Sequence, residues 1–237
     1  MSDALSITQI SMNNDLIKMQ ALSNNLANAN TVGFKRDLIQ TNEFQLKLNA
    51  NVSAPIPLAT VVTDFSQGTL NTTSNPLDVG IEGENTFFEV STDQGVYYTR
   101  QGNFSLDQFG RLVTSNGFIV NGQSGDIRLS TNNPRIDANG NVFEGVNLVG
   151  ALKLVGIEDL QNLSKLGKGL YEYSGNSAVR ELSEATVRQG FLETQNLNIP
   201  SEMVDMVELV KHFKSSQKVI QGYDDMLSEA MSVLGEF

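Results

Sequence analysis

The two ends of the chain carry apolar residues at seven-residue intervals, and this spacing constrains the fold more than any other feature. Residues 3–29 contain neither glycine nor proline, and a heptad repeat of apolar residues is typical of a helix that packs along a partner helix. Residues 201–234 carry a second repeat, preceded by Pro200 as the expected start of a helix. The sequence therefore predicts a long helix at each end. The repeats comprise Leu5, Met12, Leu16, Met19, Leu22, Leu26 and Ala29, and then Met203, Met206, Val210, Phe213, Ile220, Leu227, Met231 and Leu234.

Polar residues interrupt both repeats, at Asp15, Gln217 and Asp224. A second apolar set in the C-terminal segment indicates that this helix is enclosed from more than one direction. Isolated helices are marginally stable in water, so we expect both ends to be mobile in a free subunit and to fold on assembly. The alternative is that both helices belong to the core of an ordinary bundle. The second set comprises Val219, Tyr223, Met226, Ala230 and Val233.

The middle of the chain is rich in glycine and short β-type runs. Residues 87–90 and 96–99 flank Asp93-Gln94-Gly95, a pattern that predicts a β-hairpin. Pro55 and Pro57 favour an extended arm in the segment before it. We expect an α+β fold in which the terminal helices pair as a coiled-coil-like inner domain beside a central, mainly antiparallel β domain. The expected boundaries are 1–30 with 200–237 for the helical domain, 31–75 for the arm and 76–199 for the β domain.

Composition excludes several classes of function. The net charge of −11 is unfavourable for binding nucleic acid or anionic lipid. The chain has no cysteine and one histidine, His212, so a thiolate or histidine-rich metal site is excluded. No run of about 18 apolar residues predicts a membrane span, and the N-terminus lacks the features of a cleaved signal peptide. We expect no cofactor, metal, small-molecule substrate or nucleic-acid partner.

Three local patterns allow alternatives. Asp137, Asn139, Asn141 and Glu144 resemble a calcium loop, but Gly140 is misplaced for one, and an Asn-Gly turn is the better interpretation. Asp224 and Asp225 are adjacent on a helix and cannot form a catalytic pair. The last pattern is a basic helix face that is either solvated or meets an acidic β-domain surface of another subunit; it comprises Lys211, Lys214 and Lys218.

Several sequence blocks resemble the flagellar rod and hook protein family. Residues 22–37, which contain Asn-Asn-Leu-Ala-Asn and Thr-Val-Gly-Phe-Lys, are similar to the N-terminal signature of that family. Residues 77–90, 98–114 and 190–220 are similar to three further family blocks, in the same order. The loop Gly83-Glu84-Asn85-Thr86 departs from the family's Gly-x-Gly pattern. Residues 150–155 and 166–171 look more like the proximal, F-type rod members than the distal, G-type members.

The resemblance implies a non-enzymatic structural subunit of the bacterial flagellar basal-body rod. It implies assembly with copies of itself and other rod proteins, export through the flagellar type III apparatus, and a periplasmic rod location. Distal rod or hook-type subunits are the alternatives within the family. A secreted carbohydrate-binding or adhesin β domain, and a hydrolase with two β-loop carboxylates, are the rivals of other classes.

Residues of two kinds are candidates for function. The expected assembly interface consists of the heptad residues already named except Ala29, together with Asn24, Asn25 and Asn28. Asparagine is unfavourable inside a helix. These three side chains and Asn30 either end the helix or bond to neighbouring chains, and we expect the second because the family carries the same motif. The motif residues implied by the resemblance are Gly33, Phe34, Lys35, Asp78, Gly83, Tyr98, Arg100 and Gly102.

Overall fold

The computed structural model describes residues 2–48, 52–175, 179–181 and 186–234, with the backbone alone for residues 2–4, 41–48, 52–58 and 233–234. The chain forms two compact units. The helical unit comprises residues 1–27, 37–64 and 198–237, and the β unit comprises residues 28–36 and 65–197. The predicted α+β class, with a helix at each end and a mostly antiparallel β domain, is confirmed.

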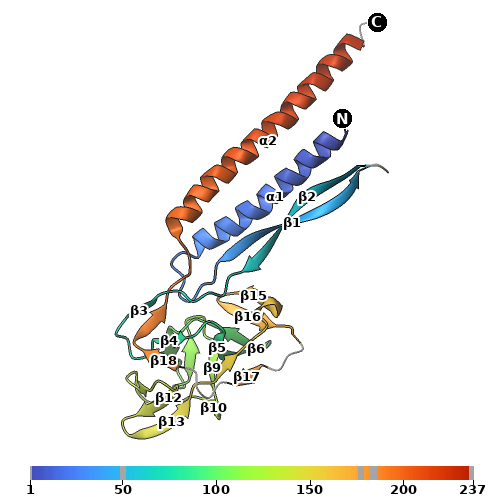
Figure 1. The fold of residues 1–237 in the computed structure, drawn as a ribbon. Helices are drawn as coiled ribbons and strands as arrows, with labels where there is room; N and C mark the ends of the chain where they lie inside the picture. The colour runs from blue at the N-terminus through green and yellow to red at the C-terminus, as the bar shows by residue number, and fades with distance from the viewer. Residues whose placement is uncertain (1, 49–51, 176–178, 182–185, 235–237) are drawn as a thin grey trace. The chain divides into compact units, whose positions relative to one another are not determined.

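In its described residues, the helical unit contains two helices and one pair of antiparallel strands (Figure 1). Helix α1 spans Ser2–Ala27 and helix α2 spans Ile199–Leu234. Strands β1 (Asp37–Leu48) and β2 (Val52–Thr63) pair antiparallel along their whole length. These strands lie in the segment for which the sequence predicts an extended arm.

The β unit is built around one antiparallel sheet. In the described residues this sheet has ten strands, with the central order β15-β16-β6-β5-β9-β8-β7; β10 pairs with β9, and β14 pairs with β5 and β17. The strands of this sheet are β5 (Thr86–Thr92), β6 (Gly95–Thr99), β7 (Phe104–Leu106), β8 (Leu112–Thr114), β9 (Ile119–Gly122), β10 (Gly125–Asp126), β14 (Leu154–Gly156), β15 (Leu163–Gly167), β16 (Leu170–Tyr173) and β17 (Arg180–Glu181).

Smaller sheets complete the β unit. One has the order β11-β12-β13, one pairs β4 with β18, and one pairs β3 with β19. A 3-10 helix at Leu160–Asn162 lies where the sequence predicts a minor helix or turn. The strands of the smaller sheets are β3 (Leu70–Thr72), β4 (Val79–Glu82), β11 (Arg135–Ile136), β12 (Asn141–Glu144), β13 (Asn147–Ala151), β18 (Thr186–Gln189) and β19 (Phe191–Glu193).

Two apolar clusters hold the β unit together. The larger cluster contains Phe88 and Phe104, whose rings meet edge to face with centroids 5.0 Å apart. The second is centred on Phe65, Phe87 and Tyr171, whose three rings also contact one another edge to face. The predicted hairpin between β5 and β6 is confirmed by pairing that runs to its turn. Among the described helices, neither is both long and apolar enough to cross a membrane.

Candidate assembly interface and its supporting contacts

Asn25 joins three elements of the helical unit. Its Nδ2 group donates to the carbonyl of Asp37 at 2.9 Å and to Oε2 of Glu202 at 3.0 Å. Its Oδ1 atom accepts the backbone N–H of Asp37 at 2.8 Å. The side chain is fully buried. A single amide thus fixes the end of α1 against the start of β1 and the start of α2, and its hydrogen bonds are made within the chain.

The other two candidate asparagines also have partners in their own chain. Asn24 is exposed, and its Nδ2 group donates to Oδ2 of Asp37 at 2.8 Å. Asn28 follows the end of α1, and its Oδ1 atom accepts the hydroxyl of Thr31 at 3.2 Å. These contacts stabilise the exit from α1. The partially exposed positions leave room for further contacts to a neighbouring subunit.

Asp15 explains the interruption in the N-terminal repeat. It is buried on α1, and its Oδ2 atom lies 2.7 Å from Nδ1 of His212 on α2. The adjacent Asn14 is also buried and accepts the backbone N–H of Ala59 on β2 at 3.1 Å. The polar pair Asn14 and Asp15 therefore connects α1 to α2 and to β2.

These contacts define how α1 and α2 run. Asn25 on α1 contacts Glu202 on α2. Asp15, ten residues before Asn25, contacts His212, ten residues after Glu202, so the two helices are antiparallel. If the same pairing continues to the start of α1, Ser2 lies beside Asp225. The last nine residues of α2 therefore extend past the start of α1. Consistent with this, every described side chain from Asp224 to Ser232 is exposed.

The covered face of α2 differs in part from the predicted stripe. Buried or half-buried residues follow heptad spacing from Glu202 through Met206, Phe213 and Ile220. Leu209 and Ser216, which neither predicted set contains, and Tyr223, which belongs to the second predicted set, complete this face. Met203 was predicted on the stripe, yet it points away from the covered face and is half exposed. The covered face therefore shares Met206, Phe213 and Ile220 with the predicted stripe, but it begins at Glu202 and not at Met203.

The predicted apolar interface residues divide into covered and exposed groups. Leu22 is buried, and Met12, Met19, Leu26, Met206, Val210, Phe213 and Ile220 are half-buried. The side chain of Leu234, like that of Val233, lies outside the described residues. The exposed members are Leu5, Leu16, Met203, Leu227 and Met231, and from the second set Val219, Met226 and Ala230.

A second group of contacts lies in the β unit, where Lys35, Arg100 and Glu193 form a buried ionic cluster. Lys35 Nζ lies 2.7 Å from Glu193 Oε1, and it donates to the carbonyl of Ser66 at the same distance. Arg100 Nε lies 3.4 Å from the other carboxylate oxygen of Glu193. The backbone N–H of Gly68 donates to Glu193 Oε1 at 2.8 Å. This ionic cluster fixes the segment after α1 to the segment before α2 within the β unit.

Two buried cations share one carboxylate, so backbone carbonyls must accept the remaining guanidinium hydrogens. Arg100 donates to the carbonyls of Thr86 at 2.7 Å, Gly83 at 2.6 Å and Glu84 at 3.1 Å. Burial lowers the pKa of Arg100 and the nearby Glu193 carboxylate opposes that shift. The carbonyls come from the loop that departs from the family pattern, which gives that loop a role in holding Arg100.

Two motif glycines allow close backbone approach around the ionic cluster. Gly33 has φ +64°, and a Cβ atom there would lie 2.6 Å from the carbonyl oxygen of Arg100. A Cβ atom on Gly102 would overlap the carbonyl oxygen of Val79. Any other residue would therefore push apart the strands and loops that carry the ionic cluster.

The remaining motif residues lie in the same unit. The ring of Phe34 has the ammonium of Lys165 4.6 Å from its centre. Asp78 Oδ1 accepts the side-chain amide of Asn75 at 2.9 Å. Tyr98 is half-buried, and burial, followed by the negative charge of Glu89, raises its pKa. The structure thus brings Gly33, Lys35, Gly83 and Arg100 together, while Phe34, Asp78, Tyr98 and Gly102 make the separate contacts given above.

Glu193 is the member of the ionic cluster that the sequence-based site omits. It belongs to the block of residues 190–198 that resembles the family, so it was visible as a motif residue. Two buried cations require a buried anion, and this requirement points to Glu193. The sequence does not show that Lys35 and Arg100 are buried, so it gives no reason to look for their anion.

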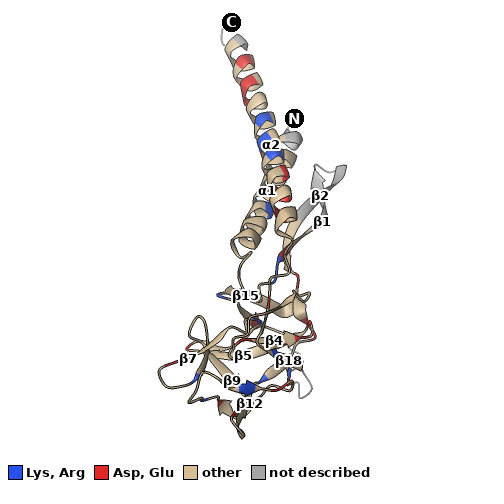
Figure 2. Ribbon diagram, turned by 90° about the vertical axis from the view of Figure 1, so that its left-hand side faces the viewer, with Lys and Arg blue, Asp and Glu red and all other residues tan. Residues whose placement is uncertain are grey.

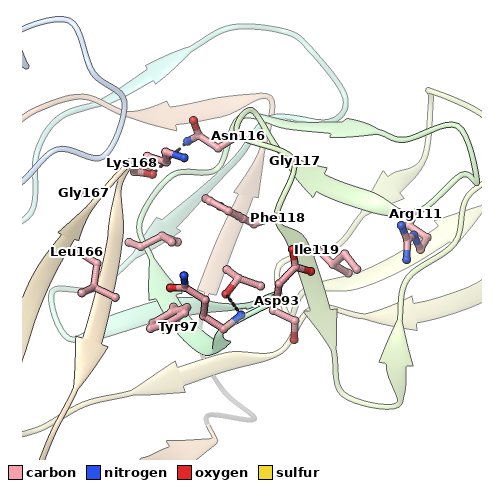
Figure 3. A pocket seen from close by; sticks show the side chains of 14 residues that line it. Asp93, Tyr97, Arg111, Asn116, Gly117, Phe118, Ile119, Leu166, Gly167 and Lys168 are labelled. Carbon is pink, nitrogen blue, oxygen red and sulfur yellow. Dashed lines mark hydrogen bonds between the residues drawn. The ribbon is translucent and has the colours of Figure 1, made fainter.

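An open cleft of about 680 Å³ lies elsewhere on the β unit (Figure 3). Asn116 donates to the carbonyl of Lys168 at 3.1 Å across one end of it, and Arg111 lies at the other end. Asp93 is the only carboxylate among the lining residues, so this cleft lacks the pair of acids that the hydrolase alternative requires. The lining comprises Ser91, Thr92, Asp93, Gln94, Tyr97, Arg111, Asn116, Gly117, Phe118, Ile119, Leu166, Gly167, Lys168 and Leu170.

The segment that resembles a calcium loop is a turn, as predicted. Asp137 Oδ1 accepts the backbone N–H groups of Asn139 and Asn141 at 3.0 and 2.9 Å. Gly140 has φ +81°, which suits the Asn-Gly turn between β11 and β12. Within the described residues, no group of three or more histidine, cysteine or acidic side chains is placed to hold a metal ion.

Comparison with known families identifies three matching regions. Residues 9–35 match the family model described as flagella basal body rod protein. Residues 80–144 match the flagellar hook protein FlgE/F/G D1 domain, and residues 188–233 match the flagellar basal body rod FlgEFG protein C-terminal model. The first and third regions include most of α1 and α2, and all three include residues of the ionic cluster or its loop.

Individual relatives match along almost the whole chain. The flagellar basal-body rod protein FlgF of Caulobacter vibrioides is 30% identical over 230 residues, covering 92% of this chain and 92% of the relative. The flagellar basal-body rod protein FlgG of Buchnera aphidicola subsp. Baizongia pistaciae is 31% identical over 258 residues, covering 97% and 98%. FlgG of Bacillus subtilis is 29% identical over 256 residues, covering 94% and 95%.

Proposed function

Because this chain belongs to the family of flagellar basal-body rod proteins, which are structural subunits and not enzymes, we propose that it polymerises into the rod through its terminal helices. In this proposal, segments 1–30 and 200–237 form a coiled-coil-like inner domain that neighbouring subunits complete. The segment 31–75 serves as an arm and the region 76–199 as the outer β domain. The partners are further copies of this chain and other rod proteins.

The observation that carries the proposal is the uncovered apolar surface of the two helices. On α2, Met226, Leu227 and Met231 all lie past the start of α1 and are exposed, Met231 to 69%. On α1, Leu5 and Leu16 are exposed, the latter to 49%. Full burial of one such side chain contributes roughly 1.5–3 kcal/mol. A neighbouring helix laid over these residues therefore gains stability that the isolated chain lacks.

The contact is expected to be heterologous. The residues exposed on α1 and those exposed on α2 are different surfaces, and repetition of a contact between unlike surfaces builds an open helical polymer. Such a polymer suits a shaft, whereas two identical surfaces would close into a dimer. We infer an axial assembly in which each subunit adds along the same direction.

Among rod proteins, we favour the proximal type. Relatives of both the FlgF and FlgG types match at similar identity, and the preference rests on residues 150–155 and 166–171, which look more like the F-type members. Export through the flagellar type III apparatus and a periplasmic position in the basal body follow from the same proposal. The distal rod and the hook are the alternative positions.

The proposal is tested by following the chain in purified basal bodies. The gene is replaced in its flagellated host by a version lacking residues 1–30, and basal bodies are isolated and probed by mass spectrometry. We expect the complete chain to be recovered in the rod fraction and the shortened chain to be absent from it. Recovery of the shortened chain in the rod, or the absence of the complete chain, would contradict the proposal.

A further inference from the structure

The cleft in Figure 3 is formed by three turns of the β unit. Asp93 lies in the turn between β5 and β6, Asn116 in the turn between β8 and β9, and Lys168 in the turn between β15 and β16. The Nδ2 group of Asn116 donates to the carbonyl of Lys168 at 3.1 Å and ties two of these turns together. The cleft volume of about 680 Å³ lies within the range of small-ligand sites. The fold therefore provides an open site at which the turns supply the polar groups.

Two aromatic side chains line this cleft. Tyr97 on β6 and Phe118 before β9 are half-buried and pack against the larger apolar cluster, while another part of each side chain faces the cleft. Figure 3 shows Phe118 between Lys168 and Arg111. The C–H face of a sugar ring packs on such an aromatic ring, and sugar hydroxyls bond to amide and carboxylate groups nearby. The lining is therefore typical of a carbohydrate site.

Lys168 supplies a positive charge at one end of the cleft. It is exposed, its Nζ atom lies 5.9 Å from the centre of the Phe118 ring, and it makes no ion pair within the described part of the chain. Its backbone is left-handed, with φ +55°, a conformation that is unfavourable for a residue with a side chain and that clusters at ligand sites. Arg111, at the other end, is already paired with Asp107, whose Oδ2 atom lies 2.8 Å from its Nε atom. Lys168 is therefore the cation that a bound anion would meet.

We propose that this cleft binds an acidic glycan chain built from N-acetylated sugars, with a sugar ring on Phe118 and Tyr97 and a carboxylate at Lys168. The Oδ1 atom of Asn116, which accepts no hydrogen bond within the described residues, is available to the N–H of an acetamido group, and Asp93 is available to a sugar hydroxyl. In the periplasm, the polymer with this chemistry is the glycan of the cell wall. That choice of polymer rests on the proposed function, whereas the cleft and its chemistry do not.

An acidic peptide is the main competing ligand. Extended peptides commonly bind by adding a strand to an unpaired sheet edge. Of the strands that line the cleft, β6 pairs with β16 and β5, β5 pairs with β6 and β9, and β9 pairs with β5 and β8. In the described part of the sheet, these three strands therefore offer a peptide no unpaired edge. A glycan needs only the aromatic rings and the polar groups of the turns, so the architecture favours the glycan.

The overall charge of the chain limits the expected affinity. The net charge is −11, and Figure 2 shows acidic and basic residues scattered together over the β unit. A bound carboxylate is therefore attracted by the local charge of Lys168 and not by a broad basic surface. Salt should weaken this attraction, because Lys168 is exposed.

The first test compares two glycans that share one sugar backbone. Cell-wall glycan strands freed of peptide by an amidase keep a lactyl carboxylate on every second sugar, and chitin oligosaccharides lack it. Each glycan is titrated into the purified full chain at low salt and followed by calorimetry. We expect the acidic strands to bind about five-fold more tightly, because only they pair with Lys168. Equal affinity for the two glycans, or no binding of the acidic strands, would overturn the proposal.

The second test changes the charge at position 168. Lys168→Gly removes the charge and suits the left-handed backbone, so the fold is kept. It should lower the affinity for the acidic strands about five-fold and leave the affinity for chitin oligosaccharides unchanged, and Lys168→Arg should bind almost normally. Arg180→Ala is the matched control, because it removes an exposed cation of the same unit outside the cleft. No loss in Lys168→Gly, or an equal loss in Arg180→Ala, would contradict the assignment of Lys168.

Two further ligands identify the source of the carboxylate. Alginate carries carboxylates on sugars without acetamido groups, and polyglutamate carries them on a peptide. We expect both to bind more weakly than the acidic cell-wall strands. Equal or tighter binding of alginate would overturn the cell wall as the source, and equal or tighter binding of polyglutamate would identify a peptide site instead.

These measurements use the free chain, so they separate this inference from the proposed function. If the chain is recovered in the rod but binds no cell-wall glycan, this inference fails and the proposed function stands. If the chain binds the glycan through Lys168 but is absent from basal bodies, the proposed function fails and the glycan site stands.

Discussion

The Nζ atom of Lys35 lies 2.7 Å from Oε1 of Glu193, and both side chains are buried. The two residues are 158 positions apart in the sequence. Replacing Glu193 by glutamine removes the carboxylate whose oxygens lie 2.7 Å from Nζ of Lys35 and 3.4 Å from Nε of Arg100. Breaking a buried ion pair in this way typically costs 3–5 kcal/mol. We expect Glu193→Gln to lower the free energy of unfolding by roughly that amount in chemical denaturation followed by circular dichroism.

Glu172→Gln is the matched control for that experiment. Glu172 lies on the exposed side of β16 in the same unit, so its loss of charge should change stability by less than about 0.5 kcal/mol. Equal stability of the two variants would show that the ionic cluster contributes little.

Asn25→Leu should loosen the helical unit. The substitution leaves the backbone groups of Asp37 and the carboxylate of Glu202 without the amide that contacts them. Each buried polar group left unpaired costs roughly 1–3 kcal/mol, and we expect a total loss of about 2–4 kcal/mol in thermal unfolding. Asn24→Ala, on the exposed side of the same turn, should cost less than about 1 kcal/mol. A tolerated leucine at position 25 would mean that α1 is held by its apolar contacts alone.

Hydrogen exchange in the free chain should divide α2 into two parts. Amides of residues 202–223 lie on the segment covered within the helical unit, and those of residues 224–234 lie beyond it. Protection follows packing, so we expect exchange at least ten-fold faster in the second segment. In assembled rods this difference should disappear. Uniform protection of α2 in the free chain would count against folding on assembly. Uniform fast exchange would show that α1 does not stabilise α2 and that the whole helix, as the sequence alone predicts, is mobile before assembly.

Lys153 provides a pH-dependent prediction for the β unit. Its Nζ atom donates to Oε1 of Glu89 at 2.9 Å, and this hydrogen bond, partly opposed by burial, raises the pKa of Lys153 above its ordinary value of 10.5. A raised lysine pKa stabilises the folded state at pH values below the ordinary pKa. This contribution to stability is lost as the pH rises through the pKa of the folded state. Glu89→Gln should return the pKa towards 10.5, measured by NMR titration of the lysine Cε signal. An unchanged pKa would show that Glu89 is not its cause, and Glu172→Gln should leave it unchanged.

The sequence predicts the two helices and the antiparallel class well because heptad spacing and turn dipeptides are local signals. The hairpin of β1 and β2 was missed because Pro55 and Pro57 argue against regular pairing. In a two-stranded sheet each strand has one unpaired edge. Prolines two positions apart can both place their nitrogen, which carries no hydrogen, on this unpaired edge, so no hydrogen bond between the strands is lost. Their partners Gln45 and Glu43 are therefore paired in register despite the prolines.

The site was predicted in part. The heptad repeats correctly predict the helices that carry the uncovered apolar residues. Periodicity alone does not show which face of a helix is covered by other parts of the same chain. Ser216 and Glu202 lie on the covered face of α2 even though they are polar. The ionic cluster depended on a partner far away in sequence, and such pairings follow from the fold and not from spacing. The sequence does not show whether Asn25 bonds within its own chain or to another subunit, because that depends on where Glu202 lies in the fold.

The antiparallel course of α1 and α2 has a practical consequence for anyone who labels this protein. Ser2 and Leu234 lie towards the same end of the helical unit (Figure 1), so a fluorescent or affinity fusion at either terminus would crowd one and the same docking region. The turn between β12 and β13 offers a better insertion point, because Val146 there is 95% exposed and a Cβ atom added to the adjacent Gly145 would meet no atom within 4 Å.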